Sequence, residues 1–467
     1  MIKNLRHFIA RIEPRHFLGA SALVGMFWLS TFSGCASSPF GSRSEETKTV
    51  TDPVHMTIHK FQLENGLRLL VVEDSTSPTF AYQTWFRVGS RNEKVKFTGL
   101  AHFFEHMMFK GTKNVKAEEF EKLLEEAGAE GENAFTSNDY TAYIQELPKD
   151  QLELIVRLES DRMVNLLVNQ ESFNTEREVV INERRWRTEN NPDGLIYQAI
   201  FEMAYKVHPY RWPVIGYKED LDRMSPQDAL DFYKTHYGPN QATVVIVGDV
   251  KASDAYSMIK KYYSDLKPVA EVAPITEREA PQSSPQHKRI PLNIQVEKMS
   301  MAFPIPDTLS NEIPVFDIIQ AVLTGGKSGR LKRALVDRGL ASNVESGADG
   351  LKDPGLFFVN VNMQKGKKAS QAEFVVMKEL ERLAARPIST QELDRAKNRI
   401  LFEFVDGLNS PYEKAKFLGR YDTVTGDYMK GFQIFQQIQK ISAADVQLVS
   451  SKYLKASRRN VVTGVPK

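Results

Sequence analysis

The sequence is poor in cysteine and in long apolar runs. It contains one cysteine, Cys35, so no disulfide can form within one chain. The main apolar run, FLGASALVGMFWLSTF at residues 17–32, is shorter than the ~20 residues that a membrane-spanning helix usually needs. Hydrophobic residues make up 42% of the 467 residues and charged residues 26%, which is ordinary for a globular protein with a sizeable core.

The sequence also lacks the marks of nucleic-acid and nucleotide binding. The formal net charge is only +2, and no clustered basic face of the kind that binds nucleic acid is evident, so no nucleic-acid partner is expected. The glycine-rich stretch TGGKSGRL (324–331) does not fit G-x-x-x-x-G-K-[ST], which argues against a phosphate-binding loop.

Residues 1–35 have the pattern of a bacterial lipoprotein signal peptide. A start with four basic residues and one acid precedes the apolar run. The following SGC resembles a lipobox, although Phe32 stands where leucine is usual, and Cys35 would become the lipidated first residue. Ala36 rather than aspartate implies an outer-membrane lipoprotein facing the periplasm of a bacterial envelope. The alternatives are a stray free thiol at Cys35 and a secreted or periplasmic protein without an anchor.

Composition divides the rest of the chain into two domains. Residues 36–54 are rich in Ser, Thr and charge, which predicts a flexible tether, with ordered structure beginning near His55. Residues 268–291 concentrate Pro, Ser and charge, which predicts an interdomain linker. The two domains are then expected over residues 55–267 and 292–467.

Strand and helix patterns alternate along the first domain. Strands are predicted on either side of Asn65-Gly66, at 79–89, within 133–147 and at 241–250. Helices are predicted at 98–110, 115–128, 149–168 and 171–189.

The ends of the two domains resemble each other. The segments MSPQDALDFYKTHYGPNQATVVIVGDV from Met224 and ISAADVQLVSSKYLKASRRNVVTGVPK from Ile441 each begin with a serine and an acid three residues later. That spacing is a capping box at a helix start. Each segment continues through a helix, a tyrosine and an asparagine to a valine-rich strand. Any two helix–strand units share part of this order, but the common cap favours a duplicated α+β domain.

The stretch GLAHFFEHMMFKGT (99–112) holds three titratable residues in an apolar run. His102 and His106 are four apart, so on a helix both imidazoles can reach one metal ion. Glu105 lies between them, close enough to act on a metal-bound water, and H-x-x-E-H is the inverzincin motif. His55 and His59 are also four apart, but their strand-like setting would separate them by about 13 Å. The alternative for His102 and His106 is a pair of core histidines.

A third ligand is expected from TEREVVINERRW. If this stretch is helical, Glu176, Val179, Val180 and Glu183 lie on one stripe that should face the core. A buried carboxylate is costly unless it is paired or binds a metal. Because two histidines and a glutamate are a known zinc set, Glu183 is the candidate third ligand. The alternative is a solvated helix face.

These motifs closely resemble the pitrilysin, insulinase and mitochondrial-processing-peptidase family of zinc peptidases. The resemblance extends to the segments ENGLRLLVVED, NAFTSNDYTAY, HPYRWPVIGYKEDL, LTGGKSGRLKRAL and FLGRYDTVTGDY. In that family the two histidines and a glutamate 77 residues downstream bind zinc, which corresponds to one Zn²⁺ per chain on His102, His106 and Glu183. The motif glutamate, here Glu105, is the general base, and Glu176 matches a supporting acid.

The resemblance also implies substrate-binding residues. Asn133, Ala134 and Phe135 would lie on an edge strand that pairs with an extended peptide backbone. Arg420 and Tyr428 would hold substrate and stabilise the oxyanion, with Tyr421 as a competitor for the second role.

The expected fold is α+β, with two related domains that each pack a mainly antiparallel sheet with helices and together form half of a clamshell. Residues 55–267 would be the catalytic domain of a zinc-dependent endopeptidase, and residues 292–467 would enclose extended or unfolded peptide substrates. Four such domains enclose a chamber in the family, which implies a homodimer or a heterodimer with a paralogous subunit. A non-catalytic peptide-binding or assembly subunit stays open, and so does a factor that trims one dedicated peptide.

Overall fold

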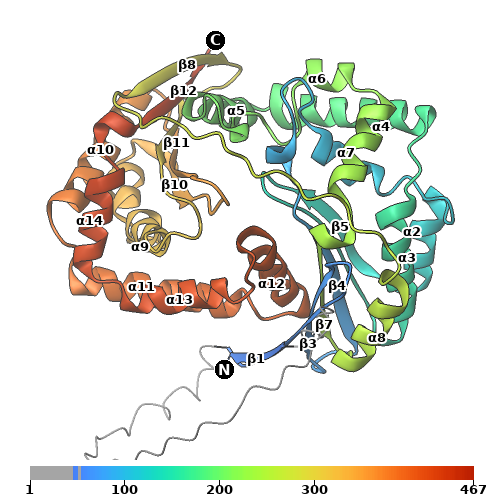
Figure 1. Cartoon of the computed structure of the whole chain (residues 1–467). Coiled ribbons are helices and arrows are strands. Elements are labelled where there is room, and N and C mark those ends of the chain that lie inside the picture. Colours follow the sequence, from blue (N-terminus) through green and yellow to red (C-terminus); the bar gives the residue numbers. More distant parts are fainter. Residues whose placement is uncertain (1–45, 51–53) are drawn as a thin grey trace, which may run out of the picture. The chain divides into compact units, whose positions relative to one another are not determined.

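The computed structural model describes residues 46–50 and 54–467, which belong to one compact unit built around two β-sheets (Figure 1). The signal peptide, Cys35 and the first part of the tether lie outside the described residues. The architecture is α+β, and both sheets are mixed but mainly antiparallel, as predicted.

The N-terminal sheet has seven strands in the order β1-β2-β3-β7-β4-β6-β5. They are β1 (Glu46–Val50), β2 (Met56–Gln62), β3 (Arg68–Glu73), β4 (Thr79–Phe86), β5 (Glu130–Thr136), β6 (Thr141–Pro148) and β7 (Ala242–Gly248). Neighbours are antiparallel except β3 and β7. The helices are α1 (Leu100–Met107), α2 (Ala117–Glu126), α3 (Leu152–Asn165), α4 (Gln170–Arg184), α5 (Pro192–Ala204), α6 (Lys218–Arg223), α7 (Pro226–His236) and α8 (Ala252–Tyr263). The strands and helices predicted for this half are confirmed.

The predicted tether is wrong at its C-terminal end. Residues Glu46–Val50 form β1, which pairs antiparallel with β2 from Glu46↔Lys60 to Val50↔Met56. Thr47 and Thr49 face their partners across the pair, and Val50 is buried. β-branched residues at alternate positions suit a strand, and this short pattern is hidden in a stretch that is otherwise polar.

The C-terminal sheet has five strands in the order β10-β11-β9-β12-β8. They are β8 (Gln286–Leu292), β9 (Lys298–Pro304), β10 (Ala341–Ala348), β11 (Leu356–Met363) and β12 (Asn460–Pro466). The helices are α9 (Ile313–Thr324), α10 (Ala369–Ala385), α11 (Thr390–Asp406), α12 (Pro411–Thr425), α13 (Lys430–Lys440) and α14 (Ala443–Tyr453).

The two halves share one topology. Apart from β1 and β2, the N-terminal order β3-β7-β4-β6-β5 matches the C-terminal order β8-β12-β9-β11-β10. In each, a parallel pair, β3 with β7 or β8 with β12, is followed by three antiparallel strands. Ser225 caps α7 and Ser442 caps α14 in capping boxes with an aspartate at the third position, and each helix leads to the last strand of its sheet. The predicted duplication is therefore visible in strand order, strand direction and helix caps.

Each half lends one helix to the other half's sheet. Helix α12 of the C-terminal half packs on β4 and β7, where Leu418 and Ala415 join the cluster of Trp85 and Val245 (Figure 1). Helix α5 of the N-terminal half packs on β9 and β12 in the same way. This exchange ties the halves together through two apolar contacts of equivalent position.

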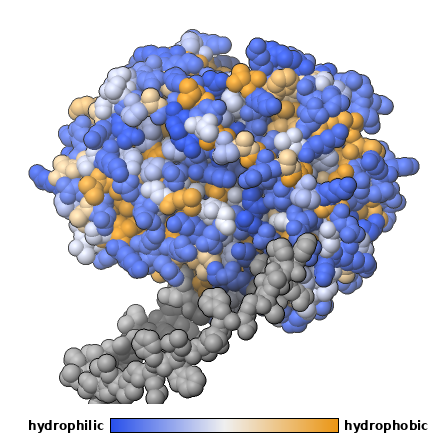
Figure 2. Space-filling model, in the orientation of Figure 1, coloured by the Kyte–Doolittle hydropathy of each residue, from blue (hydrophilic) through white to orange (hydrophobic). Residues whose placement is uncertain are grey.

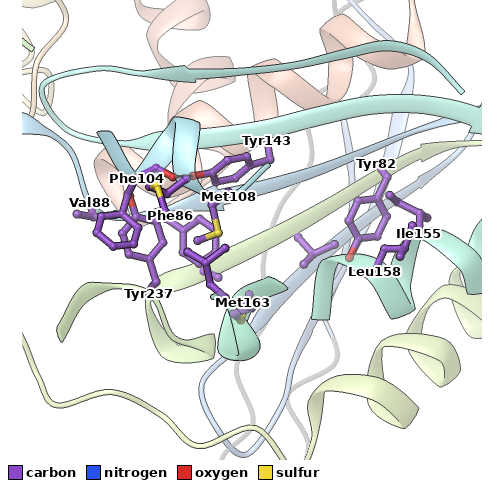
Figure 3. Close-up of a cluster of buried hydrophobic side chains, with 14 of the residues drawn as sticks. Tyr82, Phe86, Val88, Phe104, Met108, Tyr143, Ile155, Leu158, Met163 and Tyr237 are labelled. Carbon is purple, nitrogen blue, oxygen red and sulfur yellow. Dashed lines mark hydrogen bonds between the residues drawn. The ribbon is translucent and has the colours of Figure 1, made fainter. Parts of the chain in front are cut away.

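The other face of the N-terminal sheet carries the helices that hold the candidate site. Figure 3 shows Phe104 of α1 beside Phe86 and Tyr237, and Tyr82 of β4 beside Ile155 and Leu158 of α3. The ring centroids of Phe104 and Tyr237 are 5.5 Å apart. Helix α1 is thus fixed by aromatic packing on a rigid sheet.

The predicted linker is shorter than expected. Residues 264–285 form neither helix nor strand, but β8 begins at Gln286, within the predicted boundary. The segment is held in place at Glu279, whose carboxylate accepts hydrogen bonds from the backbone N–H groups of residues 206–208.

The surface seen in Figure 2 is mainly hydrophilic, with scattered hydrophobic side chains. Within the described part of the chain, none of the helices combines the length and apolar character needed to cross a membrane.

Candidate metal centre

Helix α1 starts at a turn that only glycine fits well. Gly99 has φ +94°, and a Cβ there would lie 2.7 Å from the carbonyl oxygen of Ile215. The buried carboxylate of Glu93 accepts hydrogen bonds from the backbone N–H groups of Gly99 (2.8 Å) and Ala101 (2.9 Å). These N–H groups have no partner inside the helix, and a carboxylate at this end is favoured by the helix dipole. The position of α1 is therefore set at its first residue.

One face of α1 carries the titratable residues, and the other packs against the core. His102, Glu105 and His106 share one face, while Phe103, Phe104 and Met107 are fully buried in the core on the other. The aromatic residues of the motif therefore anchor the helix rather than line the site. Phe109, beyond the helix, is the exception, because it lines a cavity together with Glu105 and His106.

Helix α4 supplies the acidic residues, but its buried stripe differs from the predicted one. Glu176 and Val180 are buried, whereas Val179 is 44% exposed. Asn169 caps the helix by accepting a hydrogen bond from the N–H of Ser172. The buried stripe follows positions 173, 176, 180 and 184, so the prediction that Val179 faces the core is wrong. Which i+3 and i+4 positions are buried depends on the elements that pack on α4, here α1 and α6.

The predicted ligands converge. The Nε2 atom of His106 lies 3.2 Å from Oε2 of Glu183, and Nε2 of His102 lies 3.6 Å from the same oxygen. The ligand atoms of the three residues all lie within 4.8 Å of one another. Among residues 46–50 and 54–467, no other three His, Cys, Asp or Glu side chains meet in this way.

The donor set fits a zinc ion. Zinc takes imidazole nitrogen and carboxylate oxygen at ~2.0–2.2 Å in a tetrahedron, which places neighbouring ligand atoms about 3.4 Å apart. The two nitrogen–oxygen separations at this site bracket that value. Two histidines and one glutamate also leave the fourth tetrahedral position open, as in catalytic zinc sites.

Glu176 contacts one of the predicted ligands. Its Oε1 lies 2.8 Å from Nδ1 of His106, and its Oε2 lies 2.7 Å from Nζ of Lys110. A carboxylate can only accept, so Nδ1 of His106 donates to Glu176, and Nε2, directed at Glu183, is the ring nitrogen that a metal ion would take in exchange for its proton. Glu176 thus lies beside a predicted ligand, and its role as a supporting acid stays a prediction.

The electrostatics of the metal-free side chains suit metal binding. Burial lowers the pKa of His102 to about 4, so its imidazole is neutral at pH 7. Burial would also lower the pKa of His106, but hydrogen bonds to Glu176 and Glu183 raise it to about 9. Burial opposes ionisation of Glu183, yet its hydrogen bond with His106 and the positive charge of Arg187 hold its pKa below the usual value. The centre therefore concentrates negative charge opposite a proton that a metal ion can replace.

Glu105 stands beside the cluster without joining it. Burial raises the pKa of Glu105, and the hydroxyl of Thr136, which donates to its Oε2 at 2.5 Å, opposes that rise. Glu105, Asn133 and Ala134 line the same cavity of about 360 Å³. Strand β5, which carries Asn133, Ala134 and Phe135, is one of the two edge strands of the sheet and contains a register shift between Glu130 and Asn133.

Arg420 and Tyr428 are not brought to the cluster. Tyr428 is buried with Ile58 and Leu70 on the face of the sheet opposite α1, and the ammonium groups of Lys48 and Lys60 lie 5.8 and 5.9 Å from its ring centre. Arg420 is exposed on α12. Their part in catalysis stays a prediction that these contacts do not support.

Three neighbours of the site were not expected from the sequence. They are Lys110, which contacts Glu176, Arg187, whose Nε lies 2.9 Å from Oε1 of Glu183, and Thr136. Lys110 and Arg187 are each four residues after a predicted ligand, and that i+4 spacing is the signal that points to them.

Comparison with known proteins places the chain in a family. A model described as insulinase (peptidase family M16) matches residues 68–217, and one described as peptidase M16 inactive domain matches residues 223–400. The zinc protease PqqE of Helicobacter pylori is 31% identical over 409 residues, which cover 86% of this chain and 91% of PqqE. The chain belongs to peptidase family M16. His102, His106 and Glu183 all lie in the segment that matches the insulinase description, and none lies in the segment that matches the inactive domain.

Solved structures agree with this placement. The crystal structure of a protease from Helicobacter pylori has a TM-score of 0.83 at 30% identity, over 91% of this chain and 100% of that chain. The periplasmic protease PqqL of Escherichia coli shares the M16 fold with a TM-score of 0.70 at 21% identity. The match covers 88% of this chain but 48% of PqqL, so PqqL is about twice as long.

Proposed function

We propose that this protein is a zinc-dependent endopeptidase that hydrolyses extended or unfolded peptides. The observation that carries the proposal is the convergence of His102, His106 and Glu183 within 4.8 Å, with Glu105 on the same helix face. Similarity to curated zinc proteases supports it. One zinc ion held by these three residues would polarise the peptide carbonyl and lower the pKa of a bound water.

Glu105 is the proposed general acid–base. It takes a proton from the attacking water and later delivers that proton to the leaving amine. Burial raises its pKa, which brings a carboxylic acid closer to the range in which it can both accept and donate. The hydroxyl of Thr136 holds Oε2, leaving Oε1 for the proton.

Strand β5 is the proposed substrate platform. Its outer edge has no strand partner within the described residues, so an extended peptide can add to the sheet there. Asn133, Ala134 and Phe135 would then lie along the substrate backbone, and Asn133 and Ala134 border the cavity of Glu105. Recognition of backbone more than side chains favours unfolded peptides over folded proteins.

Two chains are proposed to enclose the substrate. The PqqL structure contains about twice the length of this chain in one polypeptide, which supports an assembly of two such units, either a homodimer or a heterodimer with a paralogue. We further propose that the protein is an outer-membrane lipoprotein anchored at Cys35 and facing the periplasm, in keeping with the periplasmic location in the name of PqqL.

The test is a cleavage assay with a catalytic variant as control. Residues 36–467 are expressed, bound zinc is measured, and an unstructured peptide mixture is incubated with wild type, with Glu105→Gln and with added chelator. We expect zinc in both proteins, chelator-sensitive cleavage by wild type and a rate about 10²–10⁴ lower for E105Q. Equal rates for wild type and E105Q would contradict the proposal. A zinc-loaded chain that cleaves nothing would instead favour a non-catalytic or partner-dependent subunit.

A further inference from the structure

Lys110 lies in the turn after α1, four residues beyond His106. Its Nζ is 2.7 Å from Oε2 of Glu176, whose Oε1 is 2.8 Å from Nδ1 of His106. The Nε2 atom of the same histidine faces Glu183 at 3.2 Å. We propose that Lys110 is a positioning residue of the metal centre, acting through Glu176 on His106; the inference rests on the proposed zinc function.

Glu176 needs a second partner to hold a fixed orientation. Its side chain is 3% exposed, and a buried carboxylate with one free oxygen is costly. In the part of the chain that the structure describes, His106 and Lys110 are its ion-pair partners, one on each oxygen. The ion pair on Oε2 and the hydrogen bond on Oε1 together oppose rotation of the carboxylate, and this in turn restricts rotation of the His106 imidazole.

The backbone delivers Lys110 to this place. The N–H of Lys110 donates to the carbonyl of Met107 at 3.0 Å, which folds the chain back at the end of α1. Gly111 follows with φ +87°, and a Cβ there would lie 2.7 Å from the amide nitrogen of Ala117. This turn sets the Lys110 side chain against α4, so the ion pair also joins the two helices that carry the ligands.

Arg187 provides a matched comparison. It also places a positive charge beside a carboxylate of the centre, with its Nε 2.9 Å from Oε1 of Glu183, but its side chain is 62% exposed. Loss of either cation removes one positive charge near a site for a dication. Coulomb's law alone therefore predicts tighter zinc binding in both variants. A positioning role predicts the opposite for Lys110, namely that its loss weakens zinc binding.

The experiment measures zinc affinity rather than activity. Metal-free full-length protein is titrated with zinc against a chelator of known affinity, for wild type, Lys110→Met, Lys110→Arg, Arg187→Met, Glu176→Gln and the K110M/E176Q double variant. We expect K110M to weaken zinc binding about 10-fold, the range found for groups that orient metal ligands. K110R should restore most of the loss, R187M should not weaken binding, and the double variant should match E176Q alone.

Each outcome decides the inference. Unchanged or tighter zinc binding by K110M overturns it, and so does a double variant whose loss is the product of the two single losses. If K110M does not fold, Lys110→Gln takes its place with the same expected direction, and the absorption spectrum of bound Co²⁺ reports whether the ligand geometry has changed. Failure of the wild type to bind zinc would overturn the proposed function itself, and the inference with it.

Discussion

The two halves of this chain have the same fold and different chemistry. In the chain, α1 follows β4 in the N-terminal half, and α9 follows β9, the equivalent strand of the C-terminal half. Helix α1 presents His102, Glu105 and His106, whereas α9, IPVFDIIQAVLT, has no histidine. From residue 268 onward the sequence contains one histidine, His287, so that half cannot build a two-histidine site.

The apolar faces of these two helices are alike. Phe103, Phe104 and Met107 of α1 are fully buried, as are Phe316, Ile319 and Leu323 of α9. Burial of large apolar side chains supplies most of the stability of such helices. The two domains therefore share the apolar packing of this helix, while a few polar residues on its opposite face decide whether a domain can hold a metal ion.

The largest effect is expected when the N-terminal half is made to resemble its partner. His106→Ala removes a ligand and leaves two donors, too few for a catalytic zinc site, so zinc content should fall from about one ion per chain to background. The measurement is metal analysis of the purified protein, with His287→Ala as the matched control in the other half. Zinc retained by H106A, or lost from H287A, would contradict the claim that the N-terminal half alone holds zinc through His106.

The edge strands should also differ. Strand β5 borders the metal centre, and β10 is its counterpart at the edge of the C-terminal sheet. We expect Asn133→Ala to lower kcat/KM for an unstructured peptide about 10-fold, the worth of one hydrogen bond to substrate. Asn343→Ala in β10 should change it less than about 3-fold. Equal losses would mean that both edges bind peptide.

The two exchanged helices offer a smaller, structural test. A Cβ at Gly419 of α12 would lie 2.2 Å from Nε1 of Trp85, whereas one at Gly464 of β12 would lie 2.8 and 2.9 Å from methyl groups of Leu292 and Ile196. A rigid indole cannot yield, but methyl groups can. Gly419→Ala should therefore lower the free energy of unfolding by about 3 kcal/mol and Gly464→Ala by about 1 kcal/mol. Denaturant unfolding measures both, and the reverse order would contradict this packing.

The smallest effect concerns acid stability of the C-terminal half. Arg330 holds Glu392 with two hydrogen bonds of 2.8 and 2.9 Å, which lower the pKa of Glu392 from 4.5 to about 2. A lowered folded-state pKa gives stability that is complete above pH 4.5 and is lost as the pH falls toward 2. Glu392→Gln should remove about 1–2 kcal/mol at pH 7 and flatten the pH dependence below 4.5. An unchanged acid unfolding curve would count against the pair.

The cluster of His102, His106 and Glu183 could be predicted because its sequence pattern is local. The i, i+4 spacing of His102 and His106 and the i, i+7 spacing of Glu176 and Glu183 both follow from helix geometry. The duplication was visible through the caps at Ser225 and Ser442, which are also local signals. Such local patterns can be recognised in the sequence without any knowledge of tertiary contacts.

The features that the sequence did not predict depend on tertiary packing. The pairing of β1 with β2 and the exposure of Val179 are decided by neighbours distant in the chain. Phe103 and Phe104 of the motif point into the core, away from the candidate site, because the sheet lies on that side of α1. The position of Tyr428, buried on the opposite face of the sheet, is likewise set by tertiary contacts, and its predicted role stays a prediction.

The most direct test of the metal centre is a crystal structure of the zinc-loaded protein with data collected at the zinc absorption edge. The account predicts one anomalous peak per chain, about 2.0–2.2 Å from Nε2 of His102, Nε2 of His106 and a carboxylate oxygen of Glu183, and none in the C-terminal half. A peak elsewhere, or no peak at these three residues in protein that cleaves peptides, would contradict it.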